Sequence, residues 1–311
     1  MPLKYKDGSC VCTKKSKVED LEKVIYLRFG DSSKWLQSQP LRCCPLPGLL
    51  YVDQREFAVT TVADDVIDTL GSDDATTCHI AVLRHSGSGA TGLCHFDSCG
   101  TSQGVGDLVD RVSALSQDVD GRLELHIVGG FKDDDGSSEE LSRKLLSEFH
   151  KLPVDVYLLT ACISGLNNIV KNGVNHPILY GVGVSVKTGE IFPATFAYKG
   201  PDKQVRGLRH FIGDEKVINI YNHTDHRLRI SPYSYRHTDF PHAAFFLQQS
   251  DQTIRQYLST SPDVEPQHFA QQVKAAIAFF LSHPSSELVF PGGESRYFRM
   301  GQDGLWLPDK G

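Results

Sequence analysis

The sequence lacks any apolar run that approaches the roughly 20 residues a helix needs to cross a bilayer. Its first 20 residues alternate Lys, Asp and Ser and contain no apolar core of a secretory signal. Both absences argue against a membrane partner and against secretion. We therefore expect a cytoplasmic protein.

Positive charge does not cluster either. The chain has 32 Lys and Arg residues against 38 Asp and Glu residues, which gives a formal net charge of −6 at pH 7. Nucleic-acid binding depends on grouped Lys and Arg side chains that neutralise phosphates. Because the sequence has no helix-length basic stripe, we expect no nucleic-acid partner.

The cysteines lack the spacing of a metal site or of a disulfide-stapled domain. No pair has C-x-x-C spacing, and the eight residues occupy positions 10, 12, 43, 44, 78, 94, 99 and 162. A metal site built from the pairs 10/12 and 43/44 is an alternative, but these spacings do not match the usual zinc-binding patterns. We therefore expect reduced thiols, no metal and no organic cofactor.

Apolar residues make up 40% of the 311 residues, which is enough for a large buried core. No internal repeat or low-complexity linker marks a boundary. Residues 1–46 mix polar and charged side chains, and we predict an irregular covering segment there. Residues 47–311 should form a single α+β domain with a sheet core and helices packed outside it.

Short apolar or alternating runs separated by turn residues predict consecutive strands after residue 48. Helical spacing of apolar residues then predicts helices that alternate with strands. A capping box at Ser137-x-x-Glu140 places one helix start near Ser138, and Pro266 is predicted at the first position of a C-terminal helix. Hairpin turns are predicted at residues 187–189, near residue 225 and at residues 303–304.

Residues 87–92 read G-x-G-x-x-G, the pattern of a dinucleotide-binding turn. Such a turn requires a helix directly afterwards, because the N-terminus of that helix meets the pyrophosphate. Residues 93–97 form a strand-like run instead. We therefore interpret the glycines as a hairpin loop.

This hairpin brings a cysteine close to a histidine. Cys78 opens one predicted strand and His95 ends the neighbouring antiparallel strand, so both should lie at the same end of the pair. An adjacent imidazole lowers the pKa of a thiol from about 8.5 and favours the reactive thiolate. The pair then predicts a nucleophile with its base, whereas the simpler alternative is a structural Cys78 and a hydrogen-bonded core His95.

The loop before Cys78 strengthens the catalytic interpretation, because it combines a glycine with hydroxyl groups. Gly71 would allow backbone N–H groups to face a developing oxyanion. Either Ser72 or Thr77 would orient His95. The sequence alone leaves that choice open.

The same loop contains two adjacent carboxylates, Asp73 and Asp74. They could receive the ammonium group of a substrate by charge complementarity. An acidic pair in a turn is also common as a solvated surface feature, and the sequence permits either interpretation.

Residues 70–97, LGSDDATTCHIAVLRHSGSGATGLCHFD, closely resemble the core of the protein N-terminal asparagine amidohydrolases, the amidases of the N-degron pathway. This long ungapped run is far more specific than a short motif. Residues 5–46 and 132–138 are the least similar parts. Further similar runs extend from residue 47 onward, namely PGLLYVDQRE (47–56), RLELHIVGGF (122–131), KLLSEF (144–149), RISPYSY (229–235) and STSPDVEPQHF (259–269).

The resemblance implies that Cys78 corresponds to the nucleophile of this family. More distantly, the loop, Cys78 and a histidine 17 positions later are similar to the bacterial chemoreceptor glutamine deamidases. Those enzymes use a Thr six residues before the Cys, and that position is Ser72 here, although Thr69 and Thr77 also lie in the loop. The remote similarity implies a β-sandwich-like sheet core flanked by helices.

The implied activity is hydrolysis of the side-chain amide of an N-terminal asparagine, which yields N-terminal aspartate and ammonia and feeds protein degradation. Catalysis would use Cys78, His95 and Ser72. The substrates, proteins or peptides with N-terminal Asn, would be bound by a set of four residues, and the enzyme would act as a monomer. That substrate-binding set comprises Asp73, Asp74, Thr77 and Glu265. Alternatives are a glutamine deamidase or ester hydrolase acting on proteins, and a non-catalytic module that binds N-terminal peptides.

Overall fold

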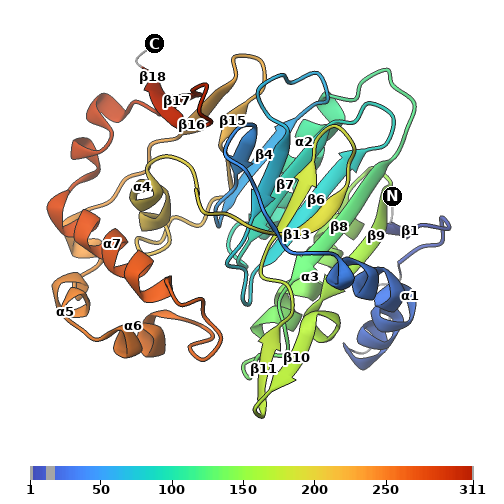
Figure 1. The fold of residues 1–311 in the computed structure, drawn as a ribbon, viewed down its shortest axis with the longest axis horizontal. Helices are drawn as coiled ribbons and strands as arrows, with labels where there is room; N and C mark the ends of the chain where they lie inside the picture. Colours follow the sequence, from blue (N-terminus) through green and yellow to red (C-terminus); the bar gives the residue numbers. More distant parts are fainter. Residues whose placement is uncertain (1–2, 12–17, 310–311) are drawn as a thin grey trace.

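Residues 3–11 and 18–309 are described in a computed structural model, and they form a mixed α+β structure built on a sheet core (Figure 1). The largest sheet has seven strands in the order β1-β9-β8-β6-β7-β4-β14. Within it β6 is antiparallel to β7 and β8, and β8 is parallel to β9. Its strands are β1 (Leu3–Tyr5), β4 (Glu56–Thr60), β6 (His79–His85), β7 (Thr91–Phe96), β8 (Leu123–Gly129), β9 (Val156–Ile163) and β14 (Ile218–Asn219).

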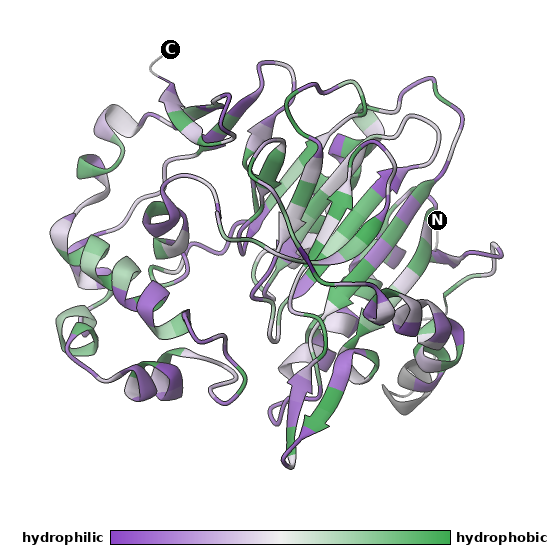
Figure 2. Ribbon diagram, in the orientation of Figure 1, coloured by the Kyte–Doolittle hydropathy of each residue, from purple (hydrophilic) through white to green (hydrophobic). Residues whose placement is uncertain are grey.

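A five-stranded sheet in the order β2-β13-β12-β5-β3 packs against the seven-stranded sheet. Ile80 and Leu93 of the large sheet share one buried cluster with Leu70 and Val182 of the small sheet. Figure 2 shows hydrophobic residues along these strands. The predicted β-sandwich-like core is therefore confirmed, while its likeness to the chemoreceptor deamidases stays a prediction. The strands of the small sheet are β2 (Arg42–Cys43), β3 (Leu49–Tyr51), β5 (Thr69–Ser72), β12 (Val182–Ser185) and β13 (Ile191–Thr195).

Helices α2 (Thr101–Ala114) and α3 (Ser137–Lys151) pack on the outer face of the seven-stranded sheet. Side chains alternate between the two faces along a strand. In β6, Leu83 lies in the cluster beneath these helices, whereas Val82 lies in the cluster between the sheets. The predicted arrangement of helices outside a sheet core is thus confirmed.

Helix α1 (Val18–Ser38) corrects the prediction of irregular structure in residues 1–46. Ile25 and Phe29 are buried with residues of β1 and β9, and Leu36 reaches the cluster between the sheets. Other apolar side chains of the helix, those of Tyr26, Leu27 and Trp35, are exposed, so the helix is stabilised by packing of its buried side chains against β9. The domain boundary at residue 46 stays a prediction.

Helix α3 begins as predicted but not through a capping box. The carboxylate of Asp133 accepts hydrogen bonds from the amides of Ser137 and Ser138, at 2.7 and 2.9 Å. Gly136 precedes the helix in a left-handed conformation with φ of 70°, and no N-cap side chain takes part. The prediction that Ser137 and Glu140 cap this helix is therefore wrong.

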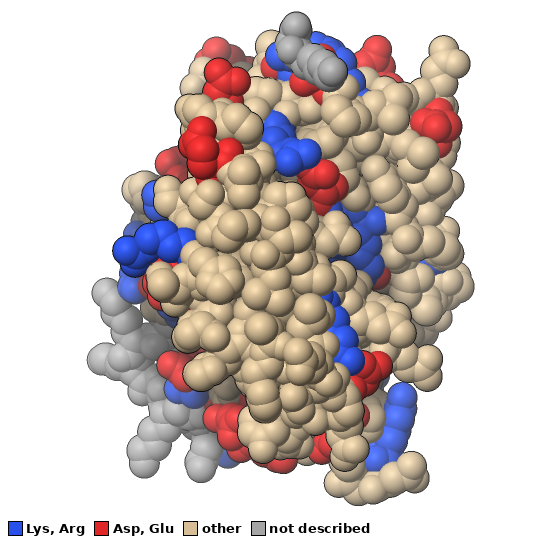
Figure 3. Space-filling model, turned by 90° about the vertical axis from the view of Figure 1, so that its left-hand side faces the viewer, with Lys and Arg blue, Asp and Glu red and all other residues tan. Residues whose placement is uncertain are grey.

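The C-terminal part forms a smaller layer of helices and strands beside the sandwich, at the left of Figure 1. Its helix α7 (Phe269–Ser282) is present as predicted and buries Val273, Ile277 and Phe280, but it begins three residues after Pro266, so this proline does not occupy the predicted first position. Viewed from this side, the centre of the surface carries few Lys, Arg, Asp or Glu side chains (Figure 3). None of the helices in residues 3–11 and 18–309 is long and apolar enough to span a membrane.

The predicted hairpins are present. β12 pairs with β13, β15 with β16, and β17 with β18, each antiparallel. The G-x-G-x-x-G residues form the turn between β6 and β7 and run into β7. The remaining elements are α4 (Lys203–Leu208), α5 (Ala243–Leu247), α6 (Asp251–Leu258), β10 (Asn168–Lys171), β11 (Val174–Pro177), β15 (Tyr221–Asn222), β16 (Arg227–Ile230), β17 (Arg296–Met300), β18 (Trp306–Asp309) and the 3-10 helices η1 (Ser164–Asn167), η2 (His237–Asp239), η3 (Ser286–Leu288) and η4 (Pro291–Gly293).

Candidate active site

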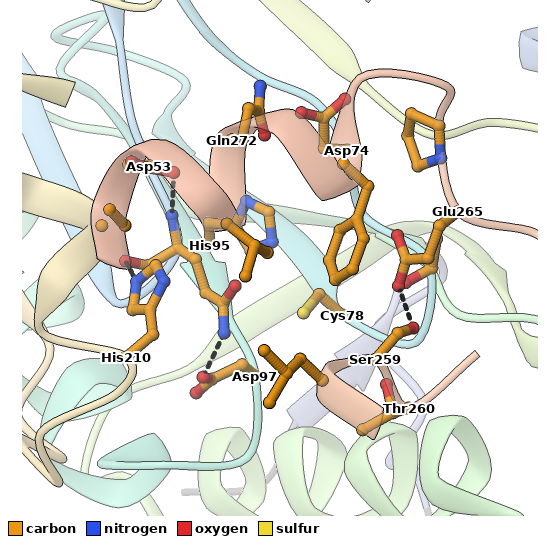
Figure 4. Close-up of a pocket in the computed structure, with 18 of the residues that line it drawn as sticks. Asp53, Asp74, Cys78, His95, Asp97, His210, Ser259, Thr260, Glu265 and Gln272 are labelled. Carbon is orange, nitrogen blue, oxygen red and sulfur yellow. Dashed lines mark hydrogen bonds between the residues drawn. The ribbon is translucent and has the colours of Figure 1, made fainter. Parts of the chain in front are cut away.

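A cavity of about 700 Å³ is lined by residues of both the sandwich and the C-terminal layer. The loop before β6 and the end of β7 form one side, and α4, α7 and the segment between α6 and α7 form the other. Figure 4 shows Cys78 with His95, Asp97 and Glu265 arranged around it. A cavity of this size can enclose a drug-sized ligand.

Cys78 and His95 both line this cavity, as the hairpin predicted. Cys78 directly precedes β6, and His95 in β7 is the register partner of Ile80. Because side chains alternate along a strand, the neighbours Cys94 and Phe96 are buried beneath the helices while His95 faces the opposite way. The strand pairing therefore brings two residues that are 17 positions apart in the sequence into one pocket.

Ser72 fixes the orientation of the His95 ring. The Ser72 hydroxyl lies 2.7 Å from His95 Nδ1, and both residues are buried. Within the described part of the chain, His95 Nε2 is buried without a hydrogen-bond partner. This geometry leaves Nε2 available to accept a proton. Thr77 was the other candidate for orienting His95, but its hydroxyl oxygen lies 3.1 Å from the hydroxyl oxygen of Thr260.

The ionisation of the pair differs from the sequence prediction. Burial, reinforced by the charges of Asp97 and Glu265, raises the pKa of Cys78 well above its ordinary value. Burial also lowers the pKa of His95 to about 4. Both shifts favour a neutral thiol beside a neutral imidazole, rather than the thiolate that the sequence predicts.

Backbone amides near the thiol can stabilise an oxyanion. The amide of Ala75 donates to the Tyr180 carbonyl at 2.9 Å, whereas the amides of Thr77 and Cys78 have no acceptor among the residues described. Unpaired N–H groups beside a nucleophile match the donors of an oxyanion hole. This arrangement is consistent with the prediction that the loop supplies the donors of an oxyanion hole.

Gly71 has a different role from the predicted one. It lies within β5, and a Cβ atom added there would be 2.1 Å from the Phe196 ring. The glycine is required because this ring packs closely on the strand, rather than because the backbone turns toward the cavity.

The two acidic residues of the loop are already engaged by protein groups. Asp73 is buried and accepts hydrogen bonds from Lys199 Nζ, the Tyr51 hydroxyl and the Phe196 amide, at 2.6, 2.9 and 3.0 Å. Asp74 is bound by Lys199 at 2.5 Å and by His268 at 3.0 Å. Because Lys199 binds both carboxylates and His268 also binds Asp74, this geometry does not favour either as the receptor of a substrate ammonium.

Glu265 also lines the cavity, between α6 and α7. Its carboxylate accepts a hydrogen bond from the Ser259 hydroxyl at 2.5 Å, and no Lys, Arg or His in the described ranges forms a salt bridge with it. Arg255 donates to the Glu265 backbone carbonyl instead, at 3.0 Å. Burial raises the pKa of Glu265 to about 7.

Sequence reasoning missed a network on the opposite side of Cys78 from Glu265 (Figure 4). Asp97 accepts hydrogen bonds from Gln54 Nε2 at 2.5 Å and from Arg55 Nε at 2.6 Å. The Arg55 amide donates to the His95 carbonyl at 2.9 Å, and His210 Nε2 lies 3.1 Å from the Gln54 carbonyl. Gln54 and Arg55 lie in the run PGLLYVDQRE, which was the available signal, whereas nothing in the sequence marked His210.

Metal-ligating side chains cluster elsewhere. Among the residues described, Asp64, Asp65 and His226 form the one such group, and they do not line the cavity. Asp64 already accepts hydrogen bonds from two backbone amides and from Thr60 and Tyr221. The seven cysteines in the described ranges are free thiols, and Cys12 lies outside those ranges.

Known proteins resemble this chain over almost its whole length. The model of the family described as protein N-terminal asparagine amidohydrolase matches residues 39–308. The protein N-terminal asparagine amidohydrolase of Mus musculus is 42% identical over 308 residues, which cover 98% of this chain and 97% of that protein. The Homo sapiens protein of the same name is 42% identical over 278 residues, 89% of each chain. The Arabidopsis thaliana one is 31% identical over 281 residues, 83% of this chain and 80% of that protein.

Proposed function

The chain belongs to the protein N-terminal asparagine amidohydrolase family, and we propose that it hydrolyses the side-chain amide of an N-terminal asparagine with Cys78 as the nucleophile. The assignment of these residues rests on one observation: Cys78 and His95 line the same cavity, and Ser72 is hydrogen-bonded to His95. A thiol and a base oriented by a third group are the parts of a cysteine hydrolase site.

The reaction begins from the neutral pair. The substrate amide enters between the thiol and the loop, and His95 Nε2 takes the Cys78 proton as the sulfur bonds to the carboxamide carbon. Ser72 accepts the hydrogen bond of Nδ1–H and holds Nε2 toward the thiol. The amides of Thr77 and Cys78 then stabilise the oxyanion of the tetrahedral intermediate.

Ammonia leaves when the His95 imidazolium returns its proton to the amide nitrogen, and the carbon remains bound to Cys78 as a thioester. A water molecule loses a proton to His95 as it attacks the thioester carbon. Cleavage of the carbon–sulfur bond releases N-terminal aspartate and restores the thiol. The protein's own groups supply each proton transfer, and we propose that no metal or organic cofactor takes part.

We propose that Glu265 binds the α-ammonium group of the substrate. A partly buried carboxylate that forms no salt bridge with a protein cation is stabilised when a positive charge binds beside it. Asp73 and Asp74 are less suited, because Lys199 binds both. An acetylated terminus or an internal asparagine has no such positive charge, so neither should be a substrate. We further propose that Thr77 borders the substrate.

The product, a protein with N-terminal aspartate, would feed the N-degron pathway of degradation. We propose that the enzyme acts on proteins and peptides in the cytoplasm, as a monomer. The acidic net charge and the lack of a clustered basic stretch in the sequence support the absence of a nucleic-acid partner.

Mass spectrometry of three matched peptides tests the proposal. An Asn-initiated peptide should show the mass gain of amide-to-acid conversion, while its Gln-initiated and acetylated counterparts should not change. Conversion of an internal glutamine in a folded protein would favour the glutamine deamidase alternative. Tight binding of the Asn peptide without conversion would favour the non-catalytic module.

A further inference from the structure

A second cavity lies beside α1, which is on the opposite side of the sandwich from the C-terminal layer (Figure 1). Its volume is about 410 Å³, within the size range of pockets that enclose apolar ligand groups. None of its lining residues belongs to the cavity that contains Cys78, so the proposed chemistry does not use it. Its apolar lining comes from α1, α3, the end of β9 and η1, and comprises Ile25, Tyr26, Leu27, Leu146, Ile163 and Leu166.

Two helices form the walls of this second cavity. In α1 the lining residues Lys23, Tyr26 and Leu27 are three and four positions apart, which places them on one helix face. A groove between two helix faces accepts the side chains of a third helix that lies along it. The lining residues of α3 have the same spacing, namely Glu139, Ser142, Arg143 and Leu146.

The α1 wall of this groove leaves large apolar side chains in solvent. Leu27 is 82% exposed and Tyr26 is 59% exposed, although both line the cavity. A ligand confined to the cavity would leave most of these two side chains uncovered, whereas a helix along the groove covers the cavity and its rim together. Removal of such apolar surface from water is favourable.

The charges at the rim select the kind of helix. Four charged side chains line the cavity, three of them cationic, and Glu139 pairs with Arg143 at 3.7 Å. Lys23 and Lys132 are exposed and form no salt bridge with any side chain that the structure describes. The rim is therefore positive although the chain as a whole is acidic, and it is complementary to carboxylates.

We propose that the groove between α1 and α3 binds an amphipathic helix of a partner protein. The apolar side chains of that helix enter the cavity, and its Asp or Glu side chains lie beside Lys23 and Lys132. Because the groove shares no lining residue with the catalytic cavity, the bound partner leaves the catalytic cavity accessible. This inference goes beyond the proposed function and does not depend on it.

Fluorescence anisotropy with the full-length enzyme tests this inference. The probe is a labelled peptide of about 16 residues, on the order of four helical turns, with Leu at spacings of three and four residues and Glu on both sides of that stripe. Its N-terminus is acetylated, so that it lacks the ammonium group proposed to bind Glu265. We expect saturable binding with a Kd of about 10 μM or lower, and binding at least about tenfold weaker when every Glu is replaced by Lys.

Variants of exposed residues then locate the binding site. Leu27→Ser and Lys132→Glu should each weaken binding of the acidic peptide at least about tenfold. Trp35→Ser is the matched control for Leu27→Ser, because Trp35 is an exposed apolar residue of the same helix outside the cavity lining. Lys171→Glu is the control for Lys132→Glu, because Lys171 is exposed and also lies outside the lining. Both controls should bind with the Kd of the wild type.

The outcomes separate this inference from the proposed function. Absence of saturable binding, or equal Kd values for the acidic and basic peptides, would overturn the helix-binding groove. Equal weakening by Trp35→Ser and Leu27→Ser would also overturn it, because the peptide would then adhere to any exposed apolar side chain. Thermal unfolding shows whether each variant is folded, and if one is not, the two peptides with the wild type decide. Failure of the wild type to convert an Asn-initiated peptide would refute the proposed function and leave the groove unaffected.

Discussion

Substitution of Glu265 by Gln tests the recognition of the free N-terminus through its pH dependence. The pKa of Glu265 is raised to about 7 by burial, and the ionised form is the one that can bind an ammonium group. At pH 6 only about a tenth of the free enzyme would hold Glu265 ionised. The value of kcat/KM should therefore fall about tenfold per pH unit below 7. The α-amino group of the substrate loses its proton near pH 7.7 to 8.0, so kcat/KM should fall again on the alkaline side.

Glu265→Gln keeps a side chain of the same shape beside Ser259 and removes the charge. We expect kcat/KM near neutral pH to fall by about thirtyfold or more, which corresponds to roughly 2 kcal/mol for a buried charge pair. The acidic limb of the profile should disappear. His95 cannot replace it, because the pKa of His95 is lowered to about 4 by burial.

The assay is the initial rate of Asn-peptide conversion between pH 5 and pH 9, a window on the order of two pH units either side of the predicted transition. Asp263→Asn is the matched control, because this exposed carboxylate lies in the same segment and outside the cavity lining. It should retain the wild-type profile. A Glu265→Gln enzyme that keeps an acidic limb near pH 7 would show that ionisation of Glu265 does not control substrate binding.

Three further changes test the catalytic pair and the fold beneath it. Ser72→Ala releases the His95 ring and should lower kcat about tenfold to a hundredfold with little change in KM. Ser72→Thr should recover most of the rate. Equal rates for both variants would contradict the role of Ser72 in positioning His95. Alkylation of Cys78 by iodoacetamide can be followed by peptide mapping. It should be slow at neutral pH and accelerate above the ordinary thiol pKa of about 8.5, because burial raises the pKa of this thiol. Rapid alkylation at neutral pH would contradict a neutral thiol beside a neutral imidazole. Gly71→Ala should destabilise the fold by about 1 to 3 kcal/mol, measured as a lower Tm, because the added Cβ would lie 2.1 Å from the Phe196 ring; an unchanged Tm would contradict that packing.

The part of the site that the sequence predicted is local in the chain. Strand alternation and the short turn between β6 and β7 fix the register, so the sequence alone places Cys78 and His95 at one end of a hairpin. The fold class followed in the same way, because alternating strands and helices leave few architectures for the core.

The part that could not be predicted depends on long-range contacts. Lys199 binds Asp73 and Asp74 from about 125 positions away in the sequence. Nothing in the local sequence indicates that a lysine already binds both carboxylates. The raised pKa of Cys78 was missed for a related reason. Burial dominates this shift, and burial is a property of the assembled cavity rather than of the neighbouring residues.

Comparison of the two thiols of the cavity, Cys78 and Cys99, tests the assignment of the nucleophile. An Asn-initiated peptide is incubated with Cys78→Ala and with Cys99→Ala, and conversion of the amide to the acid is followed by mass spectrometry. We predict that Cys78→Ala has no activity above background while Cys99→Ala remains active. Conversion by the Cys78→Ala enzyme would contradict the assignment of the nucleophile.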